Sequence, residues 1–287
     1  MEGPGLLASS LPRNQIVGFG ESAMKIIRPQ LFRRFEGKQT SLVGLLHSVG
    51  LDQSHGMSKE IIFPKILMLG DSQTQKGYNE DGWVSKLSSV YVRRCDIVNR
   101  GFSGYTTRSV LKLLPHISFL NENAIAVCIF LGSNDSAIPP SKQHVPLSEF
   151  TANLTKIVHY FNQKIDIDMN NIILITPPPY DLEAYKDELR DNCVVNNYRN
   201  ACVKSANKLG VPCVDLYSAI MGKEKWQSYL LDGLHLGKPA CNMLSELLTP
   251  IFDRILAAHP MLFPYHKDLD ENFPEETINS WLFQHSK

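Results

Sequence analysis

The sequence predicts an α/β protein, a doubly wound sandwich in which helices cover both faces of one parallel sheet. First, short and wholly apolar runs recur along the chain, as is typical of strands buried on both faces. Second, segments with helical periodicity separate these runs, as crossover connections between parallel strands require. Third, no period of 20 to 50 residues recurs, which argues against a solenoid. The expected strands are Ile66–Leu69, Ile97–Val98, Ala124–Leu131, Ile172–Ile175 and Cys213–Leu216.

Two of the expected helices carry a clear apolar stripe, which we interpret as a face buried in the core. The first stripe consists of Leu147, Phe150, Leu154, Ile157, Val158 and Phe161. The second consists of Met243, Leu244, Leu247, Leu248, Ile251, Phe252 and Ile255. Pro250 falls inside the second stripe, where it is expected to kink or restart the helix without abolishing it.

Composition narrows the classes of partner. The chain has 287 residues, of which 43% are hydrophobic and 20% charged, and this is ordinary for a globular protein. Lys plus Arg equals Asp plus Glu at 29 each. We therefore expect neither a nucleic-acid partner nor an anionic membrane surface. No apolar run approaches the length of a membrane span, so stable membrane insertion is not expected either.

The regular pattern covers residues 61–259, which we expect to form the folded domain. Residues 1–60 are interpreted as a poorly ordered N-terminal extension, and residues 260–287 as an aromatic-rich C-terminal extension. Basic residues within 1–56 leave an organelle leader open, although acidic residues there count against it. The six cysteines form no CxxC pair. We expect them to be reduced, buried thiols of an intracellular, cytoplasmic protein.

The C-terminal extension is rich in aromatic residues for a solvated tail. Two explanations are open. A helical turn containing Ile278, Trp281 and Leu282 could cover a pocket, or the segment could pack on the core or in a homodimer.

Ser72 is the first candidate for chemistry. Gly70, Asp71 and Ser72 follow the first expected strand, and a helix is expected from about Gly82 and Trp83. Ligands bind at the carboxyl ends of strands in open parallel sheets, so a hydroxyl there is placed to act as a nucleophile. The alternative is that Asp71 and Ser72 only cap the next turn.

Two further strand ends could supply hydrogen-bond donors. Gly101 and Gly104 allow tight turning and close approach of the backbone, which suits an N–H aimed at a developing oxyanion, although a simple turn would use them too. The side-chain amide of Asn134 could donate to the same oxyanion. Asp135 is expected to bond loop or cap backbone instead.

Asp232 and His235 form the last candidate group. Their spacing of three, with Gly233 between them, lets the carboxylate accept from one ring nitrogen while the other faces Ser72. Such a pair makes a general base. The acidic and histidine residues do not have an HExxH or similar ligand spacing, so we expect no metal.

These four stretches, in this order, resemble the blocks of the SGNH hydrolase superfamily, also called the GDSL esterase/lipase family, over residues 61–259. The segments 99–107, 176–179 and 232–236 resemble its isoamyl acetate-hydrolysing esterase branch. The resemblance implies a flavodoxin-like sandwich with a five-stranded parallel sheet, the SGNH hydrolase fold. It also implies a serine esterase that acts on small acyl, acetyl-type esters without a cofactor.

The resemblance implies a role for each candidate. Ser72 matches the nucleophile, and His235 matches the base that Asp232 orients. The Ser72 N–H, Gly104 and Asn134 match the oxyanion hole. Two positions depart from the family pattern, since Gln73 replaces the usual Leu or Ile and Ser133 precedes Asn134. Gln73 puts a polar side chain next to the nucleophile and leaves acyl-chain preference open.

Other functions are compatible with parts of this pattern. A deacetylase or a lysophospholipase would use the same residues on a larger substrate, and a catalytically silent scaffold would use only the fold. A nucleotide-binding flavodoxin-like module is the least consistent, because Gly70, Asp71 and Ser72 lack the glycine spacing of a phosphate cradle.

Overall fold

The computed structural model describes residues 62–117, 123–262 and 265. Their central element is a five-stranded, wholly parallel sheet with the strand order β2-β1-β3-β4-β5. This is the flavodoxin-like order, so the predicted fold class is confirmed. The strands are β1 (Lys65–Gly70), β2 (Asp96–Gly101), β3 (Ala124–Phe130), β4 (Ile172–Ile175) and β5 (Cys213–Val214).

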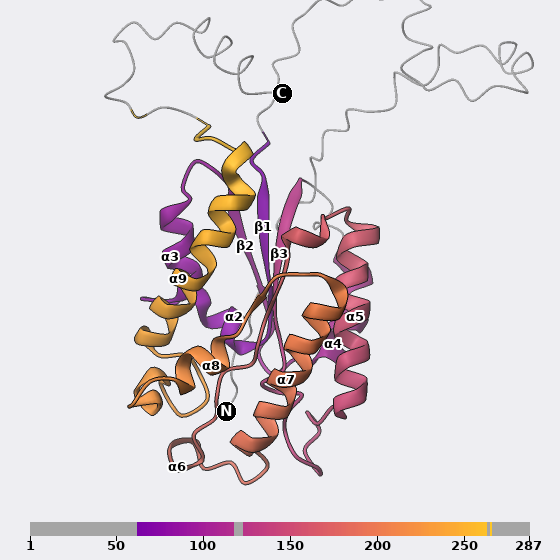
Figure 1. Cartoon of the computed structure of the whole chain (residues 1–287), viewed down its shortest axis with the longest axis vertical. Helices are drawn as coiled ribbons and strands as arrows, with labels where there is room; N and C mark the ends of the chain where they lie inside the picture. The colour runs from indigo at the N-terminus through magenta and orange to yellow at the C-terminus, as the bar shows by residue number, and fades with distance from the viewer. Residues whose placement is uncertain (1–61, 118–122, 263–264, 266–287) are drawn as a thin grey trace, which may run out of the picture. The chain divides into compact units, whose positions relative to one another are not determined.

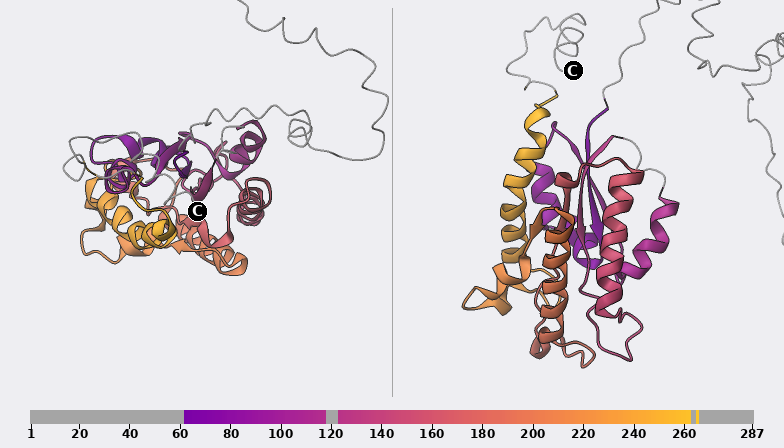
Figure 2. Two further views of the ribbon diagram at one scale, coloured as in Figure 1. Left: turned by 90° about the horizontal axis from the view of Figure 1, so that it is seen from above. Right: turned by 45° about the vertical axis from the view of Figure 1, so that its right-hand side comes forward.

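Helices form a layer on each face of the sheet, as Figures 1 and 2 show. The helices are α2 (Ser72–Gln75), α3 (Trp83–Val90), α4 (Thr107–Leu113), α5 (Leu147–Lys164), α6 (Leu182–Tyr185), α7 (Asn192–Leu209), α8 (Leu216–Met221) and α9 (Lys238–Ile255). Helices α3 and α9 pack together on one face, whereas α4, α5 and α7 cover the other.

The alternation of side chains along each strand explains why the strands are wholly apolar. In β1, Ile66 and Met68 belong to the core under α3 and α9. Leu67 and Leu69 belong to the core under α4, α5 and α7. Because successive strand residues point to opposite faces, a strand between two helical layers needs apolar residues at every position.

The helical stripes are confirmed except at two positions. Leu147 is 39% exposed and Leu247 is 37% exposed, so the prediction that these two face the core was wrong. The core face of α5 also includes a polar residue, the buried Asn153, whose Nδ2 donates to Thr107 Oγ1 at 3.1 Å. Pro250 lies inside α9, and the helix continues through it to Ile255.

The fifth strand is shorter than predicted. It ends at Val214, because Asp215 is the N-cap of α8 and its side chain accepts from the Ser218 N–H. Asp215 also pairs with Arg199 of α7. A carboxylate with two such partners ends a strand and starts a helix, and Leu216 becomes a helical residue.

The six cysteines all lie in the described residues and are free thiols. Four are buried and Cys213 is intermediate, but Cys193 is exposed, so the prediction of burial fails there. The predicted extension 1–60 lies outside the described residues, as does most of 260–287, including the segment around Trp281. No helix in the described part of the chain is long and apolar enough to cross a membrane.

Candidate active site

Ser72 lies at the turn between β1 and α2. Asp71 is the N-cap of α2, and its Oδ1 accepts from the Gln73 N–H at 2.9 Å. Ser72 is then the first residue of the helix, just past the carboxyl end of β1 (Figure 1). Asp71 therefore caps the helix, and Ser72 follows the cap directly at the carboxyl end of the strand.

The hydroxyl of Ser72 meets the imidazole of His235, although the two residues are 163 positions apart. The distance from Ser72 Oγ to His235 Nε2 is 3.0 Å. On the other side of the ring, His235 Nδ1 is 2.7 Å from Asp232 Oδ2. The structure thus brings together Ser72, His235 and Asp232 in one hydrogen-bonded chain.

Local backbone contacts hold Asp232 in place. Its Oδ1 accepts from the N–H groups of Leu234 at 3.0 Å and His235 at 2.8 Å. Burial raises the pKa of Asp232, but the hydrogen bonds from His235 and Leu234 outweigh it and leave the pKa below its ordinary value. An ionised carboxylate only accepts hydrogen bonds, so Nδ1 carries the ring proton and Nε2 is left to accept from the Ser72 hydroxyl.

Gln73 has a role that the sequence did not reveal. Its side chain is buried and its amide bonds to both residues that flank His235. Gln73 Nε2 donates to Leu234 O at 2.8 Å, and Leu236 N donates to Gln73 Oε1 at 3.1 Å. The amide therefore ties α2 to the loop that carries the imidazole. In the sequence, Gln73 was notable only because it replaces the usual Leu or Ile. Its hydrogen-bond partners are more than 160 positions away, so this role could not be predicted from its neighbours.

Asn134 and the Gly104 turn lie side by side. Asn134 is buried, and its Nδ2 donates to the carbonyl of Tyr105 at 2.9 Å. Gly104 has φ of +79°, a conformation that favours glycine. The two stretches that the sequence singled out as donors are thus joined through Tyr105.

Asp135 binds backbone, as predicted. Its carboxylate accepts from the N–H of Thr107 at 3.0 Å and from the hydroxyl of the same residue. Thr107 is the first residue of α4, so the carboxylate satisfies a free N–H at the start of that helix. Asp135 is a structural anchor for the loop that carries Asn134.

Two buried carboxyl groups lie beside the site. Burial raises the pKa of Asp71 to about 7, a shift that the Gln73 N–H opposes and the nearby Asp135 increases. Burial likewise raises the pKa of Asp135 to about 6, against the hydrogen bonds from Thr107. Asp71 Oδ2 is buried and has no hydrogen-bond partner among the described residues. Both carboxyl groups therefore keep their protons to a higher pH than an exposed aspartate does.

This predicts a pH-dependent stability. A raised pKa means that protonation of Asp71 favours the folded state, so its contribution is lost as the pH rises from its ordinary pKa of 3.8 through about 7. Asp71→Asn keeps the acceptor for Gln73 but cannot ionise. We expect the variant to remove about 2–3 kcal/mol of the fall in unfolding free energy between pH 5 and pH 8, measured by urea unfolding.

Asp81→Asn is the matched control. The hydrogen bond from Lys238 lowers the pKa of Asp81, so its contribution has the opposite sign and is lost only at more acidic pH. The control should leave the change between pH 5 and pH 8 as in the wild type. An Asp71→Asn profile parallel to the wild-type profile would contradict the assignment.

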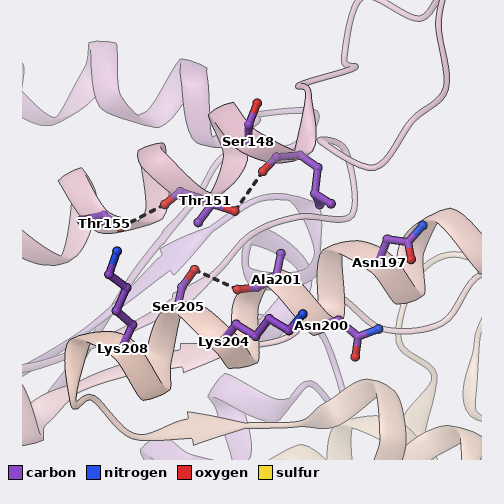
Figure 3. Close-up of a pocket in the computed structure, with 10 residues that line it drawn as sticks. Ser148, Thr151, Thr155, Asn197, Asn200, Ala201, Lys204, Ser205 and Lys208 are labelled. Carbon is purple, nitrogen blue, oxygen red and sulfur yellow. Dashed lines mark hydrogen bonds between the residues drawn. The ribbon is translucent and has the colours of Figure 1, made fainter.

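A groove lined mainly by Ser, Thr, Asn and Lys side chains lies between α5 and α7 (Figure 3), with a volume of about 640 Å³. Hydroxyl groups in it are satisfied within their own helices, since Thr151 donates to Leu147 O at 2.9 Å and Ser205 to Ala201 O at 2.8 Å. None of Ser72, Asp232 and His235 lines it. The groove therefore adds nothing to the site. In the described ranges, no group of three or more His, Cys, Asp or Glu could hold a metal ion.

Comparison with known proteins agrees with this geometry. The GDSL-like Lipase/Acylhydrolase family matches residues 68–239. The chain is 37% identical over 243 residues to the human isoamyl acetate-hydrolyzing esterase 1 homolog, covering 80% of this chain and 98% of the relative. It is 34% identical over 224 residues to the isoamyl acetate-hydrolyzing esterase of Saccharomyces cerevisiae, covering 71% and 92%.

A solved structure shares the fold. The lipase/acylhydrolase from Enterococcus faecalis superposes with a TM-score of 0.57 at 24% identity, covering 69% of this chain and 98% of that one. The resemblance drawn from the sequence is confirmed by these matches. The chain therefore belongs to the GDSL-like lipase/acylhydrolase family and is a carboxylic ester hydrolase.

Proposed function

We propose that the protein is a serine esterase that hydrolyses small, acetyl-type esters. The observation that carries this proposal is the hydrogen-bonded chain from Ser72 Oγ through His235 to Asp232, with distances of 3.0 Å and 2.7 Å. A hydroxyl, an imidazole and a carboxylate in this order form an activated nucleophile.

The reaction is a two-step acyl transfer. His235 Nε2 takes the Ser72 proton while Oγ attacks the ester carbonyl, and the resulting imidazolium is stabilised by Asp232. The proton then passes to the departing alcohol, and the acyl group stays on Ser72. A water molecule attacks the acyl-enzyme in the same way, which releases the acid and restores the hydroxyl.

The oxyanion of each tetrahedral intermediate is held by the N–H groups of Ser72 and Gly104 and by the side-chain amide of Asn134. An amide NH₂ carries two hydrogens. One hydrogen of Asn134 is used by Tyr105 O, so the other remains for the substrate. The loss of one donor of this kind typically lowers kcat by about 10²–10³-fold.

The acetyl preference is supported by the names of the relatives, which describe hydrolysis of isoamyl acetate, an acetate ester. An intracellular location is supported by the free thiols of the six cysteines. We retain the homodimer as a prediction.

The test is a series of p-nitrophenyl esters from acetate to octanoate, combined with labelling by a fluorophosphonate probe. We expect kcat/KM to be highest for the shortest chains and the probe to label the wild type and Ser89→Ala, a control at an exposed serine, but not Ser72→Ala. Rates that rise toward octanoate would favour a lysophospholipase. A protein that neither labels nor turns over any ester would be a silent scaffold.

A further inference from the structure

We propose that Arg190 is a positioning residue for the oxyanion hole, and that it holds Asn134 directly and Gly104 through Gln143. The inference rests on the proposed function, since it assigns a residue to the support of its donors. Arg190 lies outside all four sequence motifs, in the loop just before α7.

The guanidinium of Arg190 is buried, with a side chain only 6% exposed. One side of it pairs with Asp187, whose Oδ2 is 3.2 Å from Arg190 Nε. The other side points at oxygen atoms of the Asn134 loop and of Gln143. A buried charge is costly unless its donors are satisfied, so this placement is unusual for a residue that only holds a surface loop.

Arg190 and Tyr105 together fix which way the amide of Asn134 faces, since Tyr105 O accepts from its Nδ2 and Arg190 donates to its Oδ1. Arg190 Nη2 is 3.4 Å from Asn134 Oδ1, and Nη1 donates to the carbonyl of Ser133. A guanidinium has donors but no acceptor, so the amide oxygen must face Arg190 and the NH₂ must face away from it. If this contact is lost, only the bond from Nδ2 to Tyr105 O at 2.9 Å still holds the amide, and the amide can then shift away from the position where it would meet the oxyanion.

Arg190 Nη2 is also linked to Gly104, through the side chain of Gln143. Arg190 Nη2 donates to Gln143 Oε1 at 2.9 Å, and Gln143 Nε2 donates to the carbonyl of Gly104 at 3.0 Å. Gly104 has φ of +79°, where glycine has wide conformational freedom. A bond to its carbonyl restrains the turn that carries the donor N–H.

One group therefore supports two donors that come from different loops. The donors of an oxyanion hole act only when they are held at the place where charge develops, so a small displacement is expensive in rate. Arg190 is expected to act on kcat through this geometry, whereas a residue that merely holds the loop would change only stability.

The experiment compares Arg190→Met, Arg190→Lys and Gln143→Met on p-nitrophenyl acetate. We expect Arg190→Met to lower kcat by about 10²-fold with little change in KM, because both donors lose their support. Lysine keeps the charge but lacks the planar fork, so Arg190→Lys should not restore kcat. Gln143→Met leaves the contact with Asn134 intact and should lower kcat by about 10-fold.

Arg199→Met is the matched control. Arg199 lies on α7 and pairs with Asp215, away from the donors. Its loss should lower the melting temperature and leave kcat unchanged. As a second readout, a reversible boronate inhibitor, which forms a tetrahedral adduct with the nucleophile, should bind Arg190→Met more weakly by about the same factor as kcat falls.

The outcomes separate the two proposals. Wild-type kcat and boronate affinity in Arg190→Met, with only a lower melting temperature, would overturn the positioning role. Should Arg190→Met not fold, an unchanged kcat in Gln143→Met would overturn it, and a reduced kcat would support it. Turnover that persists in Ser72→Ala would instead contradict the proposed function, because that variant removes the nucleophile and leaves Arg190 in place.

Discussion

Replacement of Ser72 by alanine is expected to lower kcat for p-nitrophenyl acetate by about 10⁴–10⁶-fold. The change removes only the Oγ atom, which lies 3.0 Å from His235 Nε2. In the proposed mechanism no acyl-enzyme can then form, and only attack by water assisted by the remaining groups is left. The measurement is steady-state turnover together with the melting temperature, which should stay close to that of the wild type.

The matched control is Ser89→Ala, which removes the hydroxyl of an exposed residue on α3. It should turn over the ester at the wild-type rate, so that the contrast with Ser72→Ala prepared in the same way assigns the activity to this protein and to the hydroxyl of Ser72. Activity in Ser72→Ala within tenfold of the wild type would remove Ser72 from the mechanism.

Gly101→Ala is expected to have the largest effect on stability, with a loss of at least about 3 kcal/mol in unfolding free energy. Gly101 ends β2 opposite Gly70, and the backbone of α2 packs directly on it. A Cβ there would lie 2.0 Å from Gln75 N and 2.6 Å from Thr74 C. These are backbone atoms of the helix that begins with Ser72, so relief of the clash displaces Ser72. Urea unfolding and kcat should therefore both change.

Gly210→Ala is the control for this variant. Gly210 is the C-cap of α7 with φ of +70°, and nothing lies within 4 Å of an added Cβ. Its cost is that of the left-handed backbone alone, about 1–2 kcal/mol, and kcat should not change. Equal effects of the two substitutions would mean that close packing at Gly101 is not important.

The fold could be predicted from local patterns because each element leaves its own periodicity in the sequence. The continuous apolar run of β1 indicates that helices cover both faces of the sheet, and Ile66 and Leu67 indeed belong to different cores. The boundary of β5 could not be predicted, because Asp215 ends the strand through contacts with Ser218 and with Arg199 of α7. The exposure of Leu147 could not be predicted either, because it depends on which elements pack against α5 and not on the residue type.

Some residues of the candidate site could likewise be predicted from local patterns, and others could not. Ser72, Asp232 and His235 could be named in advance, because each follows a local signal, a strand end or a spacing of three. Gln73 and Arg190 could not be named, because the contacts that single them out are with residues far away in the sequence.

What the sequence determined by itself was the order of strands and helices and the residue types at their ends, since hydrophobic period and turn chemistry act over a few neighbouring residues. What only the tertiary structure decided was which of those ends meet. Ser72 reaches His235 across 163 positions and Arg190 reaches Asn134 across 56. Such contacts follow from the winding of the chain around the sheet, because parallel strands bring their carboxyl ends to one edge wherever they lie in the sequence.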